Sequence, residues 1–181
     1  MTEAAGPQFE NKEGIDHNAR KFTVGTIDTN FLTQHSTSSY VLITDWLVTD
    51  AKSETKLVHK KLANGEIQYF LISKITQNST RKTDKRQISE DEYKKRLVSS
   101  VVHVEKSRYE FNFLQNGIAF TMKYDEFPNS DGRVLEVDGA SETERNKFSP
   151  NGFPYRLVEV TGDLRYYGYR VAKVLTAFQE N

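Results

Sequence analysis

Charged side chains alternate with apolar ones along three short segments of the chain, and their residue types suit phosphate chemistry. Lys106 and Arg108 are two residues apart, as are Glu136 and Asp138, and a further carboxylate, Glu159, lies between Val158 and Val160. Successive side chains of a β-strand point to opposite faces, so each pair would project from one face of a sheet. Cations in such an array hold phosphate oxygens, and carboxylates hold Mg²⁺ or Mn²⁺, which neutralises charge on a phosphoryl group.

The alternation has two interpretations. It is typical of an ordinary antiparallel sheet with one apolar face on the core and one polar face in water. In a closed barrel with an apolar outer shell, the polar face would instead line the interior. The residues alone leave the solvated face and the charged lumen both open.

The elements that would position these residues are mainly β-strands. Strand-like runs are expected from Ala19 and then over 39–48, 56–62, 66–75, 107–114, 118–126, 133–138 and 155–161. Asn64-Gly65 and Asn116-Gly117 join neighbouring runs and predict hairpins with type I′ turns, in which both residues have positive φ. Eight or so strands joined by hairpins predict a closed antiparallel barrel or a strongly curved sheet.

Helices are expected at only three places. Ser89 and Glu92 have the spacing of a capping box and predict a helix that begins at Ser89. A short helix is expected over 141–148 and a C-terminal helix over 164–179. The polar stretch 76–86 is expected to be a loop that contains at most a short strand. The fold class is therefore α+β, dominated by antiparallel strands with a few flanking helices.

Composition limits the classes of function. The 181 residues suit one domain, expected over 15–181 after a flexible lead-in over 1–14. Lysine and arginine number 25, as do aspartate and glutamate, so net charge predicts neither a nucleic-acid nor a membrane partner. The chain has no cysteine, which excludes a disulfide framework, thiol catalysis and a cysteine-ligated zinc site. A signal-like apolar segment is lacking, and we expect a cytoplasmic protein.

Several short sequence motifs resemble the signatures of the CYTH superfamily. These triphosphate tunnel proteins include class IV adenylyl cyclases, thiamine triphosphatase and inorganic triphosphatases. The best match is its closing signature, here Glu159-Val160-Thr161 followed by Asp163, Arg165 and Tyr166. Lys106-Ser107-Arg108-Tyr109, Asp125-Glu126-Phe127 and Glu136-Val137-Asp138 resemble three preceding elements. The resemblance implies an eight-stranded antiparallel tunnel barrel.

The first half of the chain departs from that pattern. Lys21 ends a segment similar to the opening motif Glu-x-Glu-x-Lys, and Arg81 begins one similar to Arg-x-Glu-x-Glu. Four positions at which the family has carboxylates hold other residues, namely His17, Ala19, Thr83 and Lys85. A hard divalent cation needs clustered oxygen ligands, so these replacements predict a shift from metal binding towards anion binding.

The resemblance also implies roles for individual residues. Those implied to bind phosphate are Lys21, Lys60, Lys74, Arg81, Lys106, Arg108 and Arg165. Those implied to hold Mg²⁺ or Mn²⁺ are Glu136, Asp138 and Glu159. A catalytic role is implied for Glu136, Glu159 and Lys21.

Three functions remain open on this basis. The first is a domain that binds a triphosphate, nucleotide or other polyphosphate anion in a basic tunnel, with weak or lost turnover. The second is an active metal-dependent triphosphatase or adenylyl cyclase. The third is a pseudoenzyme that acts through its outer surface, with a protein partner or as a homodimer.

Overall fold

The core of the fold is one antiparallel sheet. The structure, a computed structural model, describes residues 19–49, 52–77, 80–100, 102–128 and 132–166. The strands are β1 (Arg20–Val24), β2 (Ser36–Thr49), β3 (Ser53–Leu62), β4 (Ile67–Gln77), β5 (Thr80–Ile88), β6 (Val102–Gln115), β7 (Ile118–Glu126), β8 (Arg133–Asp138) and β9 (Leu157–Glu159). Their order in the sheet is β5-β4-β3-β2-β6-β7-β8-β1-β9. The expectations for 1–14 and His17, and for the C-terminal helix beyond residue 166, lie outside these residues.

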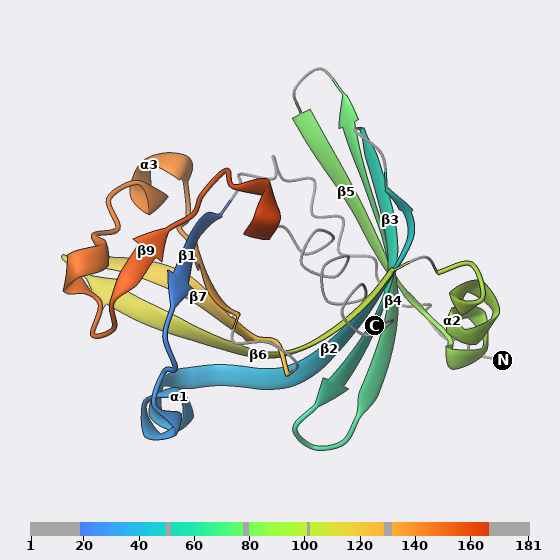
Figure 1. Cartoon of the computed structure of the whole chain (residues 1–181), viewed down its shortest axis with the longest axis horizontal. Coiled ribbons are helices and arrows are strands. Elements are labelled where there is room, and N and C mark those ends of the chain that lie inside the picture. Colours follow the sequence, from blue (N-terminus) through green and yellow to red (C-terminus); the bar gives the residue numbers. More distant parts are fainter. Residues whose placement is uncertain (1–18, 50–51, 78–79, 101, 129–131, 167–181) are drawn as a thin grey trace, which may run out of the picture.

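The sheet is strongly curved. In Figure 1 β2 and β6 run along the base, β3, β4 and β5 rise on one side, and β7, β1 and β9 lie on the other. The mainly antiparallel fold class is confirmed. The described residues form nine strands rather than eight, and the hydrogen-bonded ladder has β5 and β9 as its two edges.

The two predicted hairpins form with different turns. At the β6–β7 turn Asn116 has a φ of 52° and Gly117 a φ of 77°, which confirms the type I′ geometry. At the β3–β4 turn Gly65 has a φ of 86° and Asn64 has a negative φ. The Gly65 amide donates to the Leu62 carbonyl, so this loop is one residue longer than a type I′ hairpin.

Other expected boundaries change where tertiary contacts decide them. The stretch 76–86, expected to be a loop with at most a short strand, is mainly strand, because Thr80–Ile88 forms β5 and pairs with β4 along its whole length. The polar residues of β5 fit its position at one edge of the sheet. Strand β6 begins at Val102 rather than residue 107, and β9 covers only 157–159 of the expected 155–161.

Among the described residues, five short helical segments flank the sheet. They are α1 (Thr29–His35), α2 (Glu90–Leu97), α3 (Glu142–Arg145) and the 3₁₀ turns η1 (Pro150–Gly152) and η2 (Leu164–Tyr166). The predicted cap of α2 is confirmed, since the Ser89 hydroxyl accepts from the Glu92 amide at 3.1 Å. Within the described residues, no helix has both the length and the apolar character needed to cross a membrane.

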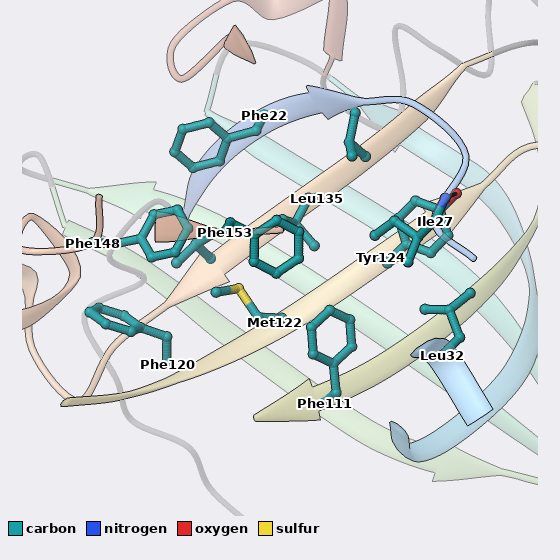
Figure 2. Packing of buried hydrophobic residues seen from close by; sticks show 12 residues of the cluster. Phe22, Ile27, Leu32, Phe111, Phe120, Met122, Tyr124, Leu135, Phe148 and Phe153 are labelled. Carbon is teal, nitrogen blue, oxygen red and sulfur yellow. Dashed lines mark hydrogen bonds between the residues drawn. The ribbon is translucent and has the colours of Figure 1, made fainter. Parts of the chain in front are cut away.

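Most of the apolar core lies on the outer, convex face of the sheet, whereas Trp46 and Val104 of a smaller cluster lie on the inner face. Figure 2 shows its main cluster, in which Phe22, Phe111, Met122 and Leu135 are all at most 1% exposed. These side chains come from β1, β6, β7 and β8, and α1, α3 and η1 cover them. A smaller cluster around Leu57 lies beneath α2. Because the helices cover the outer face, the inner face of the sheet is left for other side chains.

A buried carboxylate joins α2 to the outer face. Asp45 on β2 accepts from the Tyr93 hydroxyl at 2.7 Å and lies 2.8 Å from Nδ1 of His103 on β6. The side chain of Asp45 is 3% exposed, whereas that of His103 is 56% exposed. The hydrogen bond to Asp45 raises the pKa of His103 above its ordinary value of 6.5.

We expect the stability that His103 adds to fade as pH rises. A group whose folded-state pKa is raised contributes stability that is complete below its unfolded pKa and is lost as pH rises through the folded pKa. Urea unfolding of the wild type and His103→Gln from about pH 5.5 to about pH 9 measures this contribution. The difference in unfolding free energy should be largest at the acidic end; a difference that does not change with pH would contradict it.

Candidate functional site

The inner face of the curved sheet lines a cavity of about 550 Å³. Each of the strands β1 to β8 contributes to its lining. Among the described residues its cationic side chains are Lys21, Lys56, Lys60, Lys74, Lys85, Lys106, Arg108 and Lys123. The acidic ones are Glu54, Glu110, Glu136 and Asp138. Eight cations against four carboxylates make this lining electropositive.

Strand β6 shows how the sequence produces such a cavity. Lys106, Arg108 and Glu110 line the cavity, whereas Tyr109 and Phe111 between and beside them pack with the outer aromatic cluster. The alternation therefore reflects a charged lumen rather than a solvated face. The helices on the outer face pack against the apolar side chains of β6. The strand can therefore have charged side chains on its inner face and still bury its outer face.

One side of the cavity is lined by cations that carboxylates hold. We call it the carboxylate wall; its charged residues are Lys21, Lys106, Arg108, Glu110, Lys123, Glu136 and Asp138, with Asp125 beneath them. Asp125, 3% exposed, accepts from Lys106 Nζ at 2.5 Å and from Arg108 Nε and Nη2, each at 2.6 Å. Burial and the neighbouring Arg108 lower the pKa of Lys106, while Asp125 opposes the change.

The other carboxylates of this wall are paired in the same way. Glu136 accepts from Lys21 Nζ at 2.9 Å and lies 3.3 Å from Arg108 Nη2. Burial would raise the pKa of Glu136, but Arg108 and Lys21 outweigh it and hold that pKa far below its usual range. Asp138 accepts from Lys123 Nζ at 2.7 Å. Both carboxylates already hold protein cations.

On the opposite side of the cavity, aromatic rings as well as a carboxylate hold lysine side chains. We call this side the lysine wall; its charged residues are Glu54, Lys56 and Lys60 on β3, Lys74 on β4 and Lys85 on β5. Three of these ammonium groups lie over aromatic rings: Lys56 over Trp46 at 5.6 Å, Lys60 over Tyr40 at 3.9 Å, and Lys85 over Phe70 at 4.2 Å.

Lys56 is the most perturbed group of the lysine wall. Its Nζ lies 2.8 Å from Glu54 Oε1, and its side chain is 19% exposed. Burial is the main reason that its pKa is lowered to about 8; Lys74 and Lys106 act in the same direction, and Glu54 opposes them. The Lys56 side chain therefore has a pKa close to neutral pH.

The structure brings most of the predicted site residues into this cavity. Those that line it are Lys21, Lys60, Lys74, Lys106, Arg108, Glu136 and Asp138. The side chain of Arg81 is outside the described part of the chain. Arg165 is exposed and donates to Asp163 at 2.6 Å. It lies outside the cavity lining.

Glu159 lies on the other face of the sheet. It is paired with Phe22 in the β1–β9 register, and directly opposed residues point to the same side. Phe22 belongs to the outer core, so Glu159 is on the outer face too, where it accepts from Arg20 Nη2 at 2.7 Å. The structure therefore does not bring Glu159 to Glu136 and Asp138.

Sequence reasoning missed three cavity lysines, Lys56, Lys85 and Lys123. Lys56 is two residues before Val58 on a strand whose alternation was already visible, so strand period alone could have found it. Lys85 fell in the stretch expected to be a loop. Lys123 pairs across strands with Glu136, a relation that appears only once the strand register is known.

The donors around the cavity do not fit a protein-bound divalent metal ion. Within the described residues no group of three histidine or acidic side chains is placed to hold one. Glu136 and Asp138 are occupied by Lys21, Arg108 and Lys123. A hard cation would have to displace these ammonium and guanidinium groups to gather its oxygen ligands. The expected Mg²⁺ or Mn²⁺ site is therefore not supported by the side chains that the structure describes.

Comparison with solved structures finds the same architecture elsewhere. The chain is similar to two structures of NE1496, one described as an inorganic triphosphatase and the other as a hypothetical protein. Each has 25% sequence identity and a TM-score of 0.56, covering 84% of this chain and 91% and 95% of the two NE1496 chains, respectively. The likeness supports the CYTH-like tunnel fold. No protein-family model and no curated protein sequence matches the chain.

Proposed function

We propose that the cavity binds a triphosphate, nucleotide or other polyphosphate anion, and that turnover of this ligand is weak or lost. The observation that carries the proposal is the excess of cations in one cavity, with eight cationic and four acidic side chains in the described lining. Such an array suits several phosphates better than one. Similarity to an inorganic triphosphatase of the same architecture supports this ligand class.

Weak turnover follows from the donor set. A triphosphatase that depends on a protein-held metal needs carboxylates free to ligate it. Here Glu136 and Asp138 hold cations of the carboxylate wall, and Glu159 lies on the outer face. Lys21, proposed as a further reactive residue, donates to Glu136. These residues would hold charge in place rather than assemble a metal centre.

We expect tripolyphosphate to stabilise the protein without added metal. A ligand that binds only the folded state adds about 2.7 kcal/mol at 100 times its dissociation constant. The measurement is thermal unfolding with tripolyphosphate or ATP, each with EDTA or with Mn²⁺, with released phosphate followed in the same samples. Stabilisation in EDTA with no phosphate and no cyclic AMP supports both parts of the proposal.

Other outcomes are equally decisive. Metal-dependent phosphate release would overturn the proposed loss of catalysis and favour an active triphosphatase, the activity by which NE1496 is described. Cyclic AMP formation would overturn it in favour of an adenylyl cyclase. The absence of any shift with either ligand would overturn anion binding itself. The double variant Lys106→Ala and Arg108→Ala is a poor control, because it leaves Asp125 buried and unpaired.

A further inference from the structure

One carboxylate of the cavity is held by hydroxyl groups. Glu110 on β6 lines the cavity and accepts from the Tyr40 hydroxyl at 2.5 Å and from the Ser38 hydroxyl at 3.2 Å. Burial and the hydrogen bond to Glu110 raise the pKa of Tyr40, so its hydroxyl remains a donor. The other acidic side chains of the described lining each pair with a lysine; they are Glu54, Glu136 and Asp138. Within the described part of the chain, Glu110 is therefore the one cavity carboxylate that has no salt bridge with a lysine or arginine.

The cations that neighbour Glu110 in the sheet are bound to other acidic groups. Lys123 is the cross-strand partner of Glu110, but its Nζ lies 2.7 Å from Asp138 Oδ2. Arg108, two residues earlier on the same face of β6, binds Asp125. If either cation moved to Glu110, it would leave another partly buried carboxylate without its partner, which costs free energy. The arrangement therefore keeps Glu110 as an acceptor that faces the cavity.

Such an acceptor distinguishes between anions. An inorganic polyphosphate offers only negatively charged oxygens, which Glu110 would repel. A hydroxyl group on the ligand would instead donate to Glu110, whose carboxylate has about four lone-pair sites, of which the Tyr40 and Ser38 hydroxyls use two. Because Lys123 and Arg108 are the neighbours of Glu110, this hydroxyl must lie close to the phosphates of the ligand. A sugar hydroxyl of a nucleotide meets that condition, whereas an amino group at the far end of its base does not.

Apolar side chains near this carboxylate suit the rest of a nucleotide. Leu42 follows Tyr40 on the inner face of β2, and Val58 on β3 is directly opposite Phe70 on β4. All four side chains line the cavity, whose volume is in the range of sites for small organic ligands. A polyphosphate chain gains nothing from apolar surface, whereas a base that packs against such side chains stabilises its complex. The lining therefore contains surface that only an organic ligand would use.

We propose that the ligand of the cavity is a ribonucleoside triphosphate, and that Glu110 accepts a hydrogen bond from a ribose hydroxyl and so selects the nucleotide over inorganic tripolyphosphate. This inference rests on the proposed function of the cavity and narrows its ligand class. Glu110 is thereby a specificity-determining residue, and the cations around it hold the phosphates.

Isothermal titration calorimetry in EDTA with ATP and dideoxy-ATP tests the recognition of ribose. The two ligands have the same base and the same phosphates, and dideoxy-ATP lacks both ribose hydroxyl groups. We expect the wild type to bind dideoxy-ATP at least about tenfold more weakly than ATP, as for the loss of a hydrogen bond to a carboxylate. In Glu110→Gln, which keeps the shape of the side chain without its charge, the difference should fall to about threefold or less.

Tripolyphosphate and a matched variant complete the experiment. Tripolyphosphate should bind Glu110→Gln more tightly than the wild type, because the change removes a repulsive charge. Asp138→Asn is the control, since it removes a carboxylate of the same cavity that Lys123 neutralises. It should change the affinities for ATP and dideoxy-ATP by the same factor and leave their ratio as in the wild type. Glu110→Ala repeats the test if the glutamine variant does not fold.

Equal binding of ATP and dideoxy-ATP by the wild type would overturn the recognition of ribose, and so would tighter binding of tripolyphosphate than of ATP. A ratio that is unchanged in Glu110→Gln would overturn the role of Glu110. In each of these cases binding of tripolyphosphate or ATP would still support the proposed function, whereas an absence of wild-type binding to all three ligands would overturn both. The two failures are therefore distinguishable in one set of titrations.

Discussion

Replacing Asp125 with asparagine is expected to lower the free energy of unfolding by about 3–5 kcal/mol, because the change leaves two buried cations without their shared counter-charge. Asp125 binds both Lys106 and Arg108, and its side chain is 3% exposed. Asparagine has nearly the same shape, so the change removes charge with little loss of packing. Glu136, at 3.3 Å from Arg108, is a remaining carboxylate contact and cannot serve both cations.

Thermal and urea unfolding measure this loss. For a chain of this length 1 kcal/mol corresponds to about 2–4 °C, so the melting temperature should fall by about 6–20 °C. The double variant Asp125→Asn and Lys106→Met removes one cation together with the carboxylate and should recover part of the loss. Tripolyphosphate should stabilise Asp125→Asn more than the wild type, since it brings negative charge to the cavity. A loss below about 1 kcal/mol would show that water, rather than Asp125, screens these cations.

The second half of the fold was predictable because its signals are local. Asn116 and Gly117 adopt the positive φ values of a type I′ turn, and β7 and β8 begin and end at their expected residues. The alternation around Arg108 correctly separated cavity side chains from core side chains. Each of these features depends on a few consecutive residues, for which turn geometry and strand period are sufficient.

The features that sequence reasoning missed depend on contacts between distant segments. Strand β5 has polar residues on both faces, and its pairing with β4 is what makes it a strand. Glu159 could not be assigned to a face without the β1–β9 register, since a shift by one residue reverses the faces. The aromatic contacts of Lys56 and Lys60 likewise join β3 to β2. A charge pattern identifies such lysines as polar but does not show what holds them.

The same register places adjacent residues of β1 on opposite faces, so their replacement should lower the unfolding free energy by very different amounts. Phe22 is fully buried in the outer core, where its ring lies 5.6 Å from that of Phe148. Thr23, the next residue, points to the inner face and is partly exposed. A sheet with its apolar core outside and its charged side chains inside therefore predicts a sharp contrast between these two neighbours.

Phe22→Ala should lower the unfolding free energy by about 3–5 kcal/mol, because it removes a large ring from a packed cluster and leaves a cavity. Thr23→Ala should change it by no more than about 0.5 kcal/mol. Urea unfolding gives both values. Titration with tripolyphosphate, at a temperature where both variants are folded, should give the wild-type affinity because neither side chain lines the cavity. The reverse order of stability would mean that β1 is shifted by one residue, which would place Lys21 outside and Glu159 inside. The stability contrast between Phe22 and Thr23 thus tests the face assignment on which every inference about the cavity depends.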